Sequence, residues 1–179
     1  MIRIILTYGL ISGAVVIVGT LITIALAGGH FASPWLGYLI MLVALSSILV
    51  GVKQHRDRAL GGVIKFRTAL LAGLGIAVVA SLAYVAIWEI YLAATHYAFM
   101  GKYIDATLQA RRAAGVSGAA YQKVVAEMEV MRRQYADPLY RLPATFAEIF
   151  PVGLLIALVS AVLLRNPRFL PARSRPVEG

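Results

Sequence analysis

Four long apolar segments divide the chain, and the charged residues gather between them. Residues 4–27, 35–52 and 68–88 contain no charged residue, and residues 145–164 contain only Glu148. A helix rises about 1.5 Å per residue, so roughly 20 residues cross a hydrocarbon core about 30 Å thick. The pattern predicts four membrane-spanning helices, at about 4–27, 35–52, 68–94 and 145–164.

The segment 95–144 differs because it mixes charged residues with an apolar stripe. Met100, Ile104 and Leu108 follow helical spacing, and a similar stripe recurs after the turn-forming stretch 115–118. The members of that second stripe are Tyr121, Val125, Met128, Met131 and Tyr135. We predict an extracytoplasmic pair of amphipathic helices between the third and fourth spans. The pattern leaves open whether the first of them continues the third span.

These elements predict an all-α polytopic membrane protein with one domain over residues 1–165. Residues 166–179 are rich in arginine and proline and are predicted to form a disordered, basic, cytoplasmic tail at the lipid surface. Ala25-Leu26-Ala27 matches a signal-peptide cleavage site, but the apolar run before it is longer than a signal peptide requires. We therefore expect the first span to be retained.

Composition agrees with a membrane location: 60% of the residues are hydrophobic and 14% are charged. The net charge of +9 comes from basic residues that flank the apolar segments. Their excess near both termini and in the 53–67 loop predicts that both termini are cytoplasmic and, if this is a bacterial inner-membrane protein, that the 95–144 segment is periplasmic. No nucleic-acid-binding motif is present, so the lipid bilayer is the expected contact. The absence of cysteine excludes disulfides and thiolate metal sites.

Three spans carry small residues at helical spacing, which allow helices to approach closely in lipid. The first span has Gly9 and Gly13, the third has Gly73, Ala77 and Ser81, and the fourth has Gly153, Ala157 and Ala161. These faces suit either packing within the chain or a dimer interface, and the sequence does not separate the two.

Glu89 and Glu148 are the candidate polar residues at the outer membrane interface, because they end one span and begin the next. Two carboxylates at one depth can share a proton, bind a cation or pair with a base. The alternatives are structural: Thr145 and Glu148 match a helix capping box, and Glu89 can pair with Arg141.

His96 follows Glu89 on the same stripe if the helix continues. Together with His30 and a glutamate it offers a conceivable zinc site, although the ligand spacing matches no known pattern. His55 is expected to be solvated. Arg56 and Asp57 form a candidate pair in the cytoplasmic loop, with a salt bridge or a helix cap as the plain interpretation. No catalytic, metal-binding or cofactor-binding residue is assigned, and no cofactor is expected.

Three stretches resemble a bacterial membrane family known only as domain of unknown function 4199. They are residues 51–66, the third-span ending Ile87-Trp88-Glu89-Ile90-Tyr91, and residues 138–153 with Thr145-Phe146-Ala147-Glu148. The resemblance covers about residues 5–165 and implies a four-span bundle with a helical excursion before the last span. It implies no activity.

The leading functional hypothesis is a structural or accessory membrane subunit that acts through helix packing, as a homodimer or with another membrane protein. The alternative is a small transporter, or a proton- or cation-coupled carrier, that uses Glu89 and Glu148. A membrane-bound enzyme is the third hypothesis, although the sequence favours a protein without catalysis.

Overall fold

The computed structural model describes residues 1–26 and 34–172, and this part of the chain is helical, without strands. The helices are α1 (Ile2–Leu26), α2 (Pro34–Leu45), α3 (Ser47–Ala59), α4 (Phe66–Ala94), α5 (Ala98–Ala113), α6 (Gly118–Ala136) and α7 (Pro138–Leu164). Four stretches are long and apolar enough to cross a membrane: Ile2–Leu26, Trp35–Ala59, Phe66–Ala94 and Pro138–Leu164. The all-α, four-span prediction is confirmed.

The second span consists of α2 and α3, which meet at Ser46. The Ser46 hydroxyl donates to the carbonyl of Val43 at 2.6 Å, a local bond that competes with the helix ladder. The helix continues to Ala59, so the prediction of a loop from residue 53 is wrong for residues 53–59. Lys53 and Asp57 pair one helical turn apart, which stabilises this polar extension.

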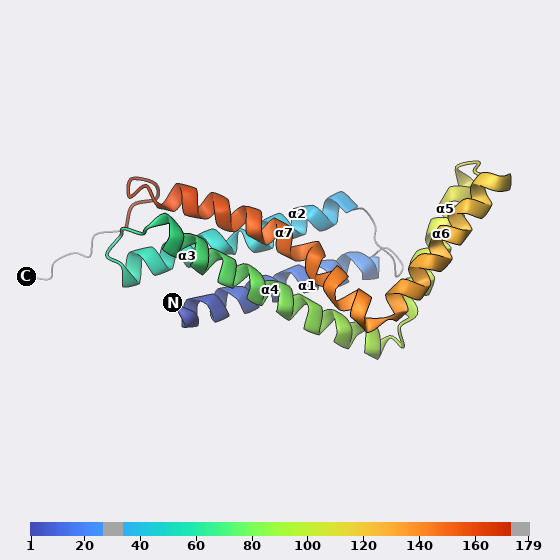
Figure 1. Ribbon diagram of the computed structural model, residues 1–179, viewed down its shortest axis with the longest axis horizontal. Helices are drawn as coiled ribbons and strands as arrows, with labels where there is room; N and C mark the ends of the chain where they lie inside the picture. The colour runs from blue at the N-terminus through green and yellow to red at the C-terminus, as the bar shows by residue number, and fades with distance from the viewer. Residues whose placement is uncertain (27–33, 173–179) are drawn as a thin grey trace, which may run out of the picture.

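The helix α4 is central and packs against α1 and α7 (Figure 1). Small residues make both contacts close: a Cβ on Gly13 would lie 2.7 Å from the Ala80 carbonyl oxygen, and one on Gly73 would lie 2.9 Å from the Ala157 Cβ. A Cβ on Gly153 would likewise lie 2.8 Å from the Ala77 Cβ. The small-residue faces are therefore used within the chain, so a partner would have to bind another surface.

The bundle has two different ends. The start of α1 and the end of α7 lie at one end, here called the terminal end, and α5 and α6 project from the other, the hairpin end (Figure 1). At the hairpin end α4 stops at Ala94, and Tyr97 N–H donates to the Leu92 carbonyl at 2.7 Å. His96 and Tyr97 have φ values of 50° and 55°, which turn the chain sharply. The first hairpin helix is thus separate from the third span.

The hairpin of α5 and α6 is packed mainly on itself. Phe99 and Ile104 of α5 are buried, whereas α6 has no buried residue. The two helices extend away from the bundle (Figure 1), and Phe99 at the start of α5 belongs to the hydrophobic core. The helices α5 and α6 contact each other along the hairpin.

Residues 166–172 follow α7 and fold back on the terminal end. Phe169 N–H donates to the Asn166 carbonyl at 3.0 Å, and the Phe169 ring packs against the core. Predicted disorder is therefore wrong for this short stretch, because buried groups of α3 bind it. The remainder of the predicted tail lies outside the described residues, as do His30 and Ala27, the last residue of the match to a cleavage site.

Candidate functional site: a clamp and an aromatic cavity at the hairpin end

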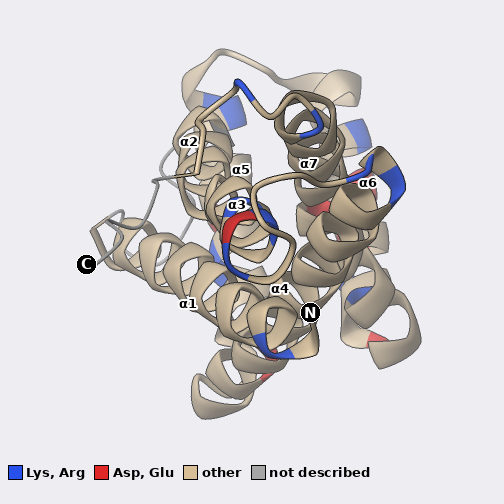
Figure 2. Cartoon of the chain, turned by 90° about the vertical axis from the view of Figure 1, so that its left-hand side faces the viewer, with Lys and Arg blue, Asp and Glu red and all other residues tan. Residues whose placement is uncertain are grey.

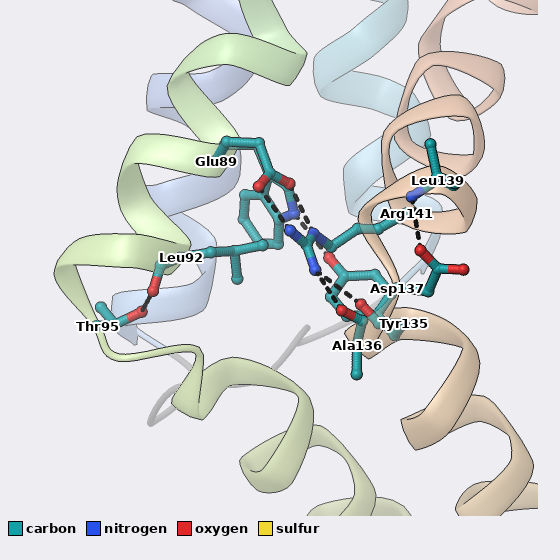
Figure 3. A network of polar contacts seen from close by, with 9 residues as sticks. Glu89, Leu92, Thr95, Tyr135, Ala136, Asp137, Leu139 and Arg141 are labelled. Carbon is teal, nitrogen blue, oxygen red and sulfur yellow. Dashed lines mark hydrogen bonds and ion pairs between the residues drawn. The ribbon is translucent and has the colours of Figure 1, made fainter.

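Glu89 and Arg141 form a two-pronged ion pair where α4 and α7 meet. Arg141 Nε donates to Glu89 Oε1 at 2.7 Å, and Nη2 donates to Oε2 at 2.8 Å (Figure 3). The Arg141 side chain is only 4% exposed, and that of Glu89 is 25% exposed. This fork-to-fork arrangement matches the planar guanidinium to the carboxylate in both shape and charge. The charge on Glu89 is therefore compensated inside the protein.

Arg141 also binds the end of α6. Its Nη1 donates to the carbonyls of Tyr135 at 2.9 Å and Ala136 at 3.4 Å. The guanidinium lies 5.1 Å from the ring centre of Tyr97 and 5.8 Å from that of Tyr135, within cation–π range. We call Glu89, Tyr135, Ala136 and Arg141 the hairpin clamp, because these contacts join α4, α6 and α7.

The local sequence explains why Arg141 reaches this place. Asp137 caps α7 by accepting a hydrogen bond from Leu139 N–H at 2.9 Å, and Pro138 occupies the first helical position, which favours proline. The helix that contains the last span therefore begins at Pro138. The capping box expected at Thr145 and Glu148 is wrong, because Thr145 lies buried in the helix interior.

Trp88 connects the clamp to the aromatic core. Its Nε1 donates to the Tyr135 hydroxyl at 2.8 Å. Its ring packs edge-on against that of Phe99, with 5.0 Å between the ring centres. Tyr84 and Trp88 are almost fully buried. Burial raises the pKa of the Tyr135 phenol, and the charges of Glu148 and Glu89 add to that rise.

Glu148 has a different environment from Glu89. It is exposed and has no hydrogen bond or ion pair with any residue that the structure describes. It lines a cavity of about 270 Å³ together with aromatic residues of α4, α5, α6 and α7. Those aromatic residues are Trp88, Phe99, Tyr103, Tyr135 and Tyr140.

A second cavity of about 420 Å³ lies beside the first and shares Met100 and Tyr135 with it. It is lined largely by apolar groups, with Arg132 and Arg141 at its polar side. Arg132 pairs with Glu129 at 3.6 Å and Arg141 with Glu89, so neither is an uncompensated charge. The free carboxylate of Glu148 distinguishes the smaller cavity.

The histidines do not join these groups. His96 is exposed in the turn after α4 and lines neither of the two cavities. Within residues 1–26 and 34–172 no three histidine or carboxylate side chains are grouped to hold a metal ion. His55, expected to be solvated, is 6% exposed instead, and its Nδ1 has no hydrogen-bond partner among the described residues.

Arg56 and Asp57 form a second clamp at the terminal end. The fully buried Arg56 donates through Nε to Asp57 at 2.7 Å and through Nη1 to the Phe169 carbonyl at 2.9 Å. Its Nη2 donates to the Leu170 carbonyl. This pair holds the segment after α7 against α3. The sequence indicated Arg56 and Asp57, but it carried no signal for the carbonyl partners.

The comparisons with known proteins give a family without a known activity. The profile described as "Protein of unknown function (DUF4199)" matches residues 7–166. No curated protein and no solved structure matches the chain. The match covers most of the chain and includes both clamps apart from the carbonyl groups of Phe169 and Leu170. The chain therefore belongs to the family of unknown function DUF4199.

Proposed function

We propose that the protein is a structural or accessory subunit of a membrane assembly, and that it holds the α5–α6 hairpin as an arm outside the bilayer. This proposal rests on one observation: the arm is largely exposed, whereas its base is held by hydrogen bonds and an ion pair. No residue of α6 is buried, whereas Arg141 at the base of the arm joins α7 to α4 and α6. An arm that extends beyond the bundle and is held firmly at its base suits the presentation of a surface to a partner.

The proposed location is the inner membrane of a bacterium, with both termini in the cytoplasm. Basic residues surround the terminal end of the bundle, as seen in Figure 2. They include Arg3, Lys53, Arg58, Lys65, Arg67, Arg165 and Arg168. An excess of arginine and lysine in short connections is typical of the cytoplasmic side. The hairpin then lies on the opposite side.

Single cysteines test this orientation, because the chain has no cysteine of its own. Ala119→Cys at the exposed start of α6 should react with a membrane-impermeant maleimide in intact cells. Val63→Cys, in the exposed α3–α4 connection, should react only after permeabilisation. The reverse pattern would overturn the proposed orientation.

The accessory role is tested by native mass spectrometry of the protein extracted in mild detergent from its own host. We expect a stoichiometric complex, either a homodimer or a pair with another membrane protein. Val130→Asp on the exposed surface of α6 should dissociate it, whereas the matched change Val63→Asp at the terminal end should not. A monomer in the unaltered host would contradict the proposal.

The carrier hypothesis used both Glu89 and Glu148. It is weaker because Glu89 is paired with Arg141, which leaves only Glu148 of the two as a free carboxylate. The enzyme hypothesis needed Glu89, His96 and Glu148 around one cavity, and the cavity lined by Glu148 includes neither of the other two.

A further inference from the structure

We propose that the 270 Å³ cavity at the hairpin end binds an organic ammonium cation, either a small amine or the amine head group of a lipid. This site does not depend on the accessory role, and each can fail without the other.

The walls of the cavity are suited to a weakly hydrated cation. Five aromatic side chains line it: Trp88, Phe99, Tyr103, Tyr135 and Tyr140. The faces of aromatic rings attract ammonium groups, and cages of such rings are a common means of recognising quaternary amines. The rings come from four helices, so the cavity exists because the hairpin clamp holds α6 beside α4 and α7.

The charge at the cavity is negative and uncompensated. Glu148 is its only ionised side chain, because no lysine, arginine or histidine lines the cavity among the described residues. The nearest candidate base on the same helix, Arg141, is already engaged by Glu89 and by backbone carbonyls. A cation in the cavity would therefore supply the partner that Glu148 lacks.

The depth of Glu148 makes such a partner favourable. Sixteen residues separate it from Leu164, the last residue of α7, which corresponds to about 24 Å along the helix axis. With Leu164 at one boundary of a hydrocarbon core about 30 Å thick, Glu148 lies within roughly 6 Å of the other. Carboxylates inside a membrane are costly unless they are paired or reach water. The polar head-group region begins at that boundary.

An organic cation fits better than a metal ion. Divalent ions take several oxygen or nitrogen ligands, and no cluster of three such acidic or histidine side chains exists in the described residues. The cavity offers one carboxylate and many ring faces. It is also large enough to accept an ammonium group with its alkyl substituents, which aromatic walls accommodate.

The test uses the full chain in dodecyl maltoside with choline as the probe. Trp88 lines the cavity, and Trp35 is removed as Trp35→Phe so that fluorescence reports on the cavity alone. We expect choline to change the emission saturably, and the uncharged isostere 3,3-dimethylbutanol to bind at least about tenfold more weakly. Equal binding of the two probes, or no saturable response to choline, would overturn the proposal.

Variants locate the site. Glu148→Gln should weaken choline binding at least about tenfold, since it removes the charge and keeps the shape. Glu127→Gln, a matched change of an exposed carboxylate on α6, should leave it unchanged. If Glu148→Gln does not fold, Tyr103→Leu provides the second measurement, because it removes one ring and should also weaken binding. Unaltered affinity in a folded Glu148→Gln protein would refute the site.

Lipid nanodiscs distinguish the two sources of the ammonium group. If nanodiscs containing phosphatidylethanolamine weaken choline binding relative to phosphatidylglycerol alone, the site takes the lipid head group. If choline binds equally in both, the site takes a soluble amine. Either result supports an ammonium site, provided that Glu148→Gln weakens the response.

Discussion

Neutralising Glu89 should destabilise the bundle more than its partial exposure suggests. Glu89→Gln keeps the size of the side chain but leaves the guanidinium of Arg141 buried at 4% exposure without a counter-charge. Removing one partner of a buried ion pair costs about 3–5 kcal/mol. Glu89 is 25% exposed, and Arg141 keeps its bonds to the Tyr135 and Ala136 carbonyls, so we expect the lower end, about 3 kcal/mol.

The pair should also be coupled in a double-mutant cycle. Arg141→Met keeps an unbranched side chain in place of the arginine stem but removes the guanidinium, and the double variant Glu89→Gln/Arg141→Met leaves no charge at this pair. Its loss of stability should be smaller than the sum of the single losses by at least about 1.5 kcal/mol. Arg141→Lys should not restore the wild-type stability, because an ammonium group cannot bind both carboxylate oxygens in the same plane.

The assay is equilibrium unfolding in mixed micelles with increasing mole fraction of dodecyl sulfate, followed by far-ultraviolet circular dichroism. The control is Glu129→Gln, whose ion pair with Arg132 is about half exposed on both sides and should contribute less than about 1 kcal/mol. A Glu89→Gln protein as stable as this control would refute the clamp as a stabilising contact. Strict additivity in the cycle would do the same.

Three further predictions follow from the packing and from the terminal end. Gly73→Val should destabilise by about 1–3 kcal/mol or more in the same assay, because a new side chain would meet Ala157, whereas Gly37→Val, with open space around it, should not. Arg56→Gln should accelerate proteolysis and amide exchange of residues 166–172 by releasing the Phe169 and Leu170 carbonyls, with the exposed Arg58→Gln as the control. Unchanged exchange at Phe169 in Arg56→Gln would contradict that role. Tyr135→Phe should lower the melting temperature by removing the acceptor of the Trp88 N–H bond, and a melting temperature equal to that of Tyr140→Phe would show that this bond contributes little.

The sequence predicted the spans because the requirement is simple: a helix in lipid needs about 20 apolar residues. The ends of the helices were harder to predict, because a helix can continue through polar residues that form ion pairs or hydrogen bonds. Lys53 and Asp57 extend α3 in this way, beyond the last apolar residue. The start of α7 was missed although Asp137-Pro138 is a helix-start signal, because the apolar pattern begins only several residues later.

Within the candidate site, Glu89 and Arg141 could be named as partners since opposite charges at one membrane depth attract. The sequence could not predict the contribution of Tyr135. Its backbone carbonyl accepts from Arg141 and its hydroxyl accepts from Trp88. Of the aromatic residues that line the cavity, the sequence placed Tyr135 on a predicted amphipathic stripe, and only the packing of four helices shows that five aromatic residues line the cavity with Glu148. The spacing of side chains along one helix does not show which side chains of other helices will line the same cavity.

The burial of Arg56 has a consequence for biogenesis. Its guanidinium belongs to the second span, yet it donates to a carbonyl that is synthesised 113 residues later. During translation the first two spans therefore enter the membrane with a charged group that lacks two of its final acceptors and must remain at the water interface. The bundle can close around α3 only after the last span has been inserted and the residues beyond it have left the ribosome. Arg56 thus makes completion of the chain a condition for the final packing, and a protein truncated just after α7 should remain open to membrane quality-control proteases.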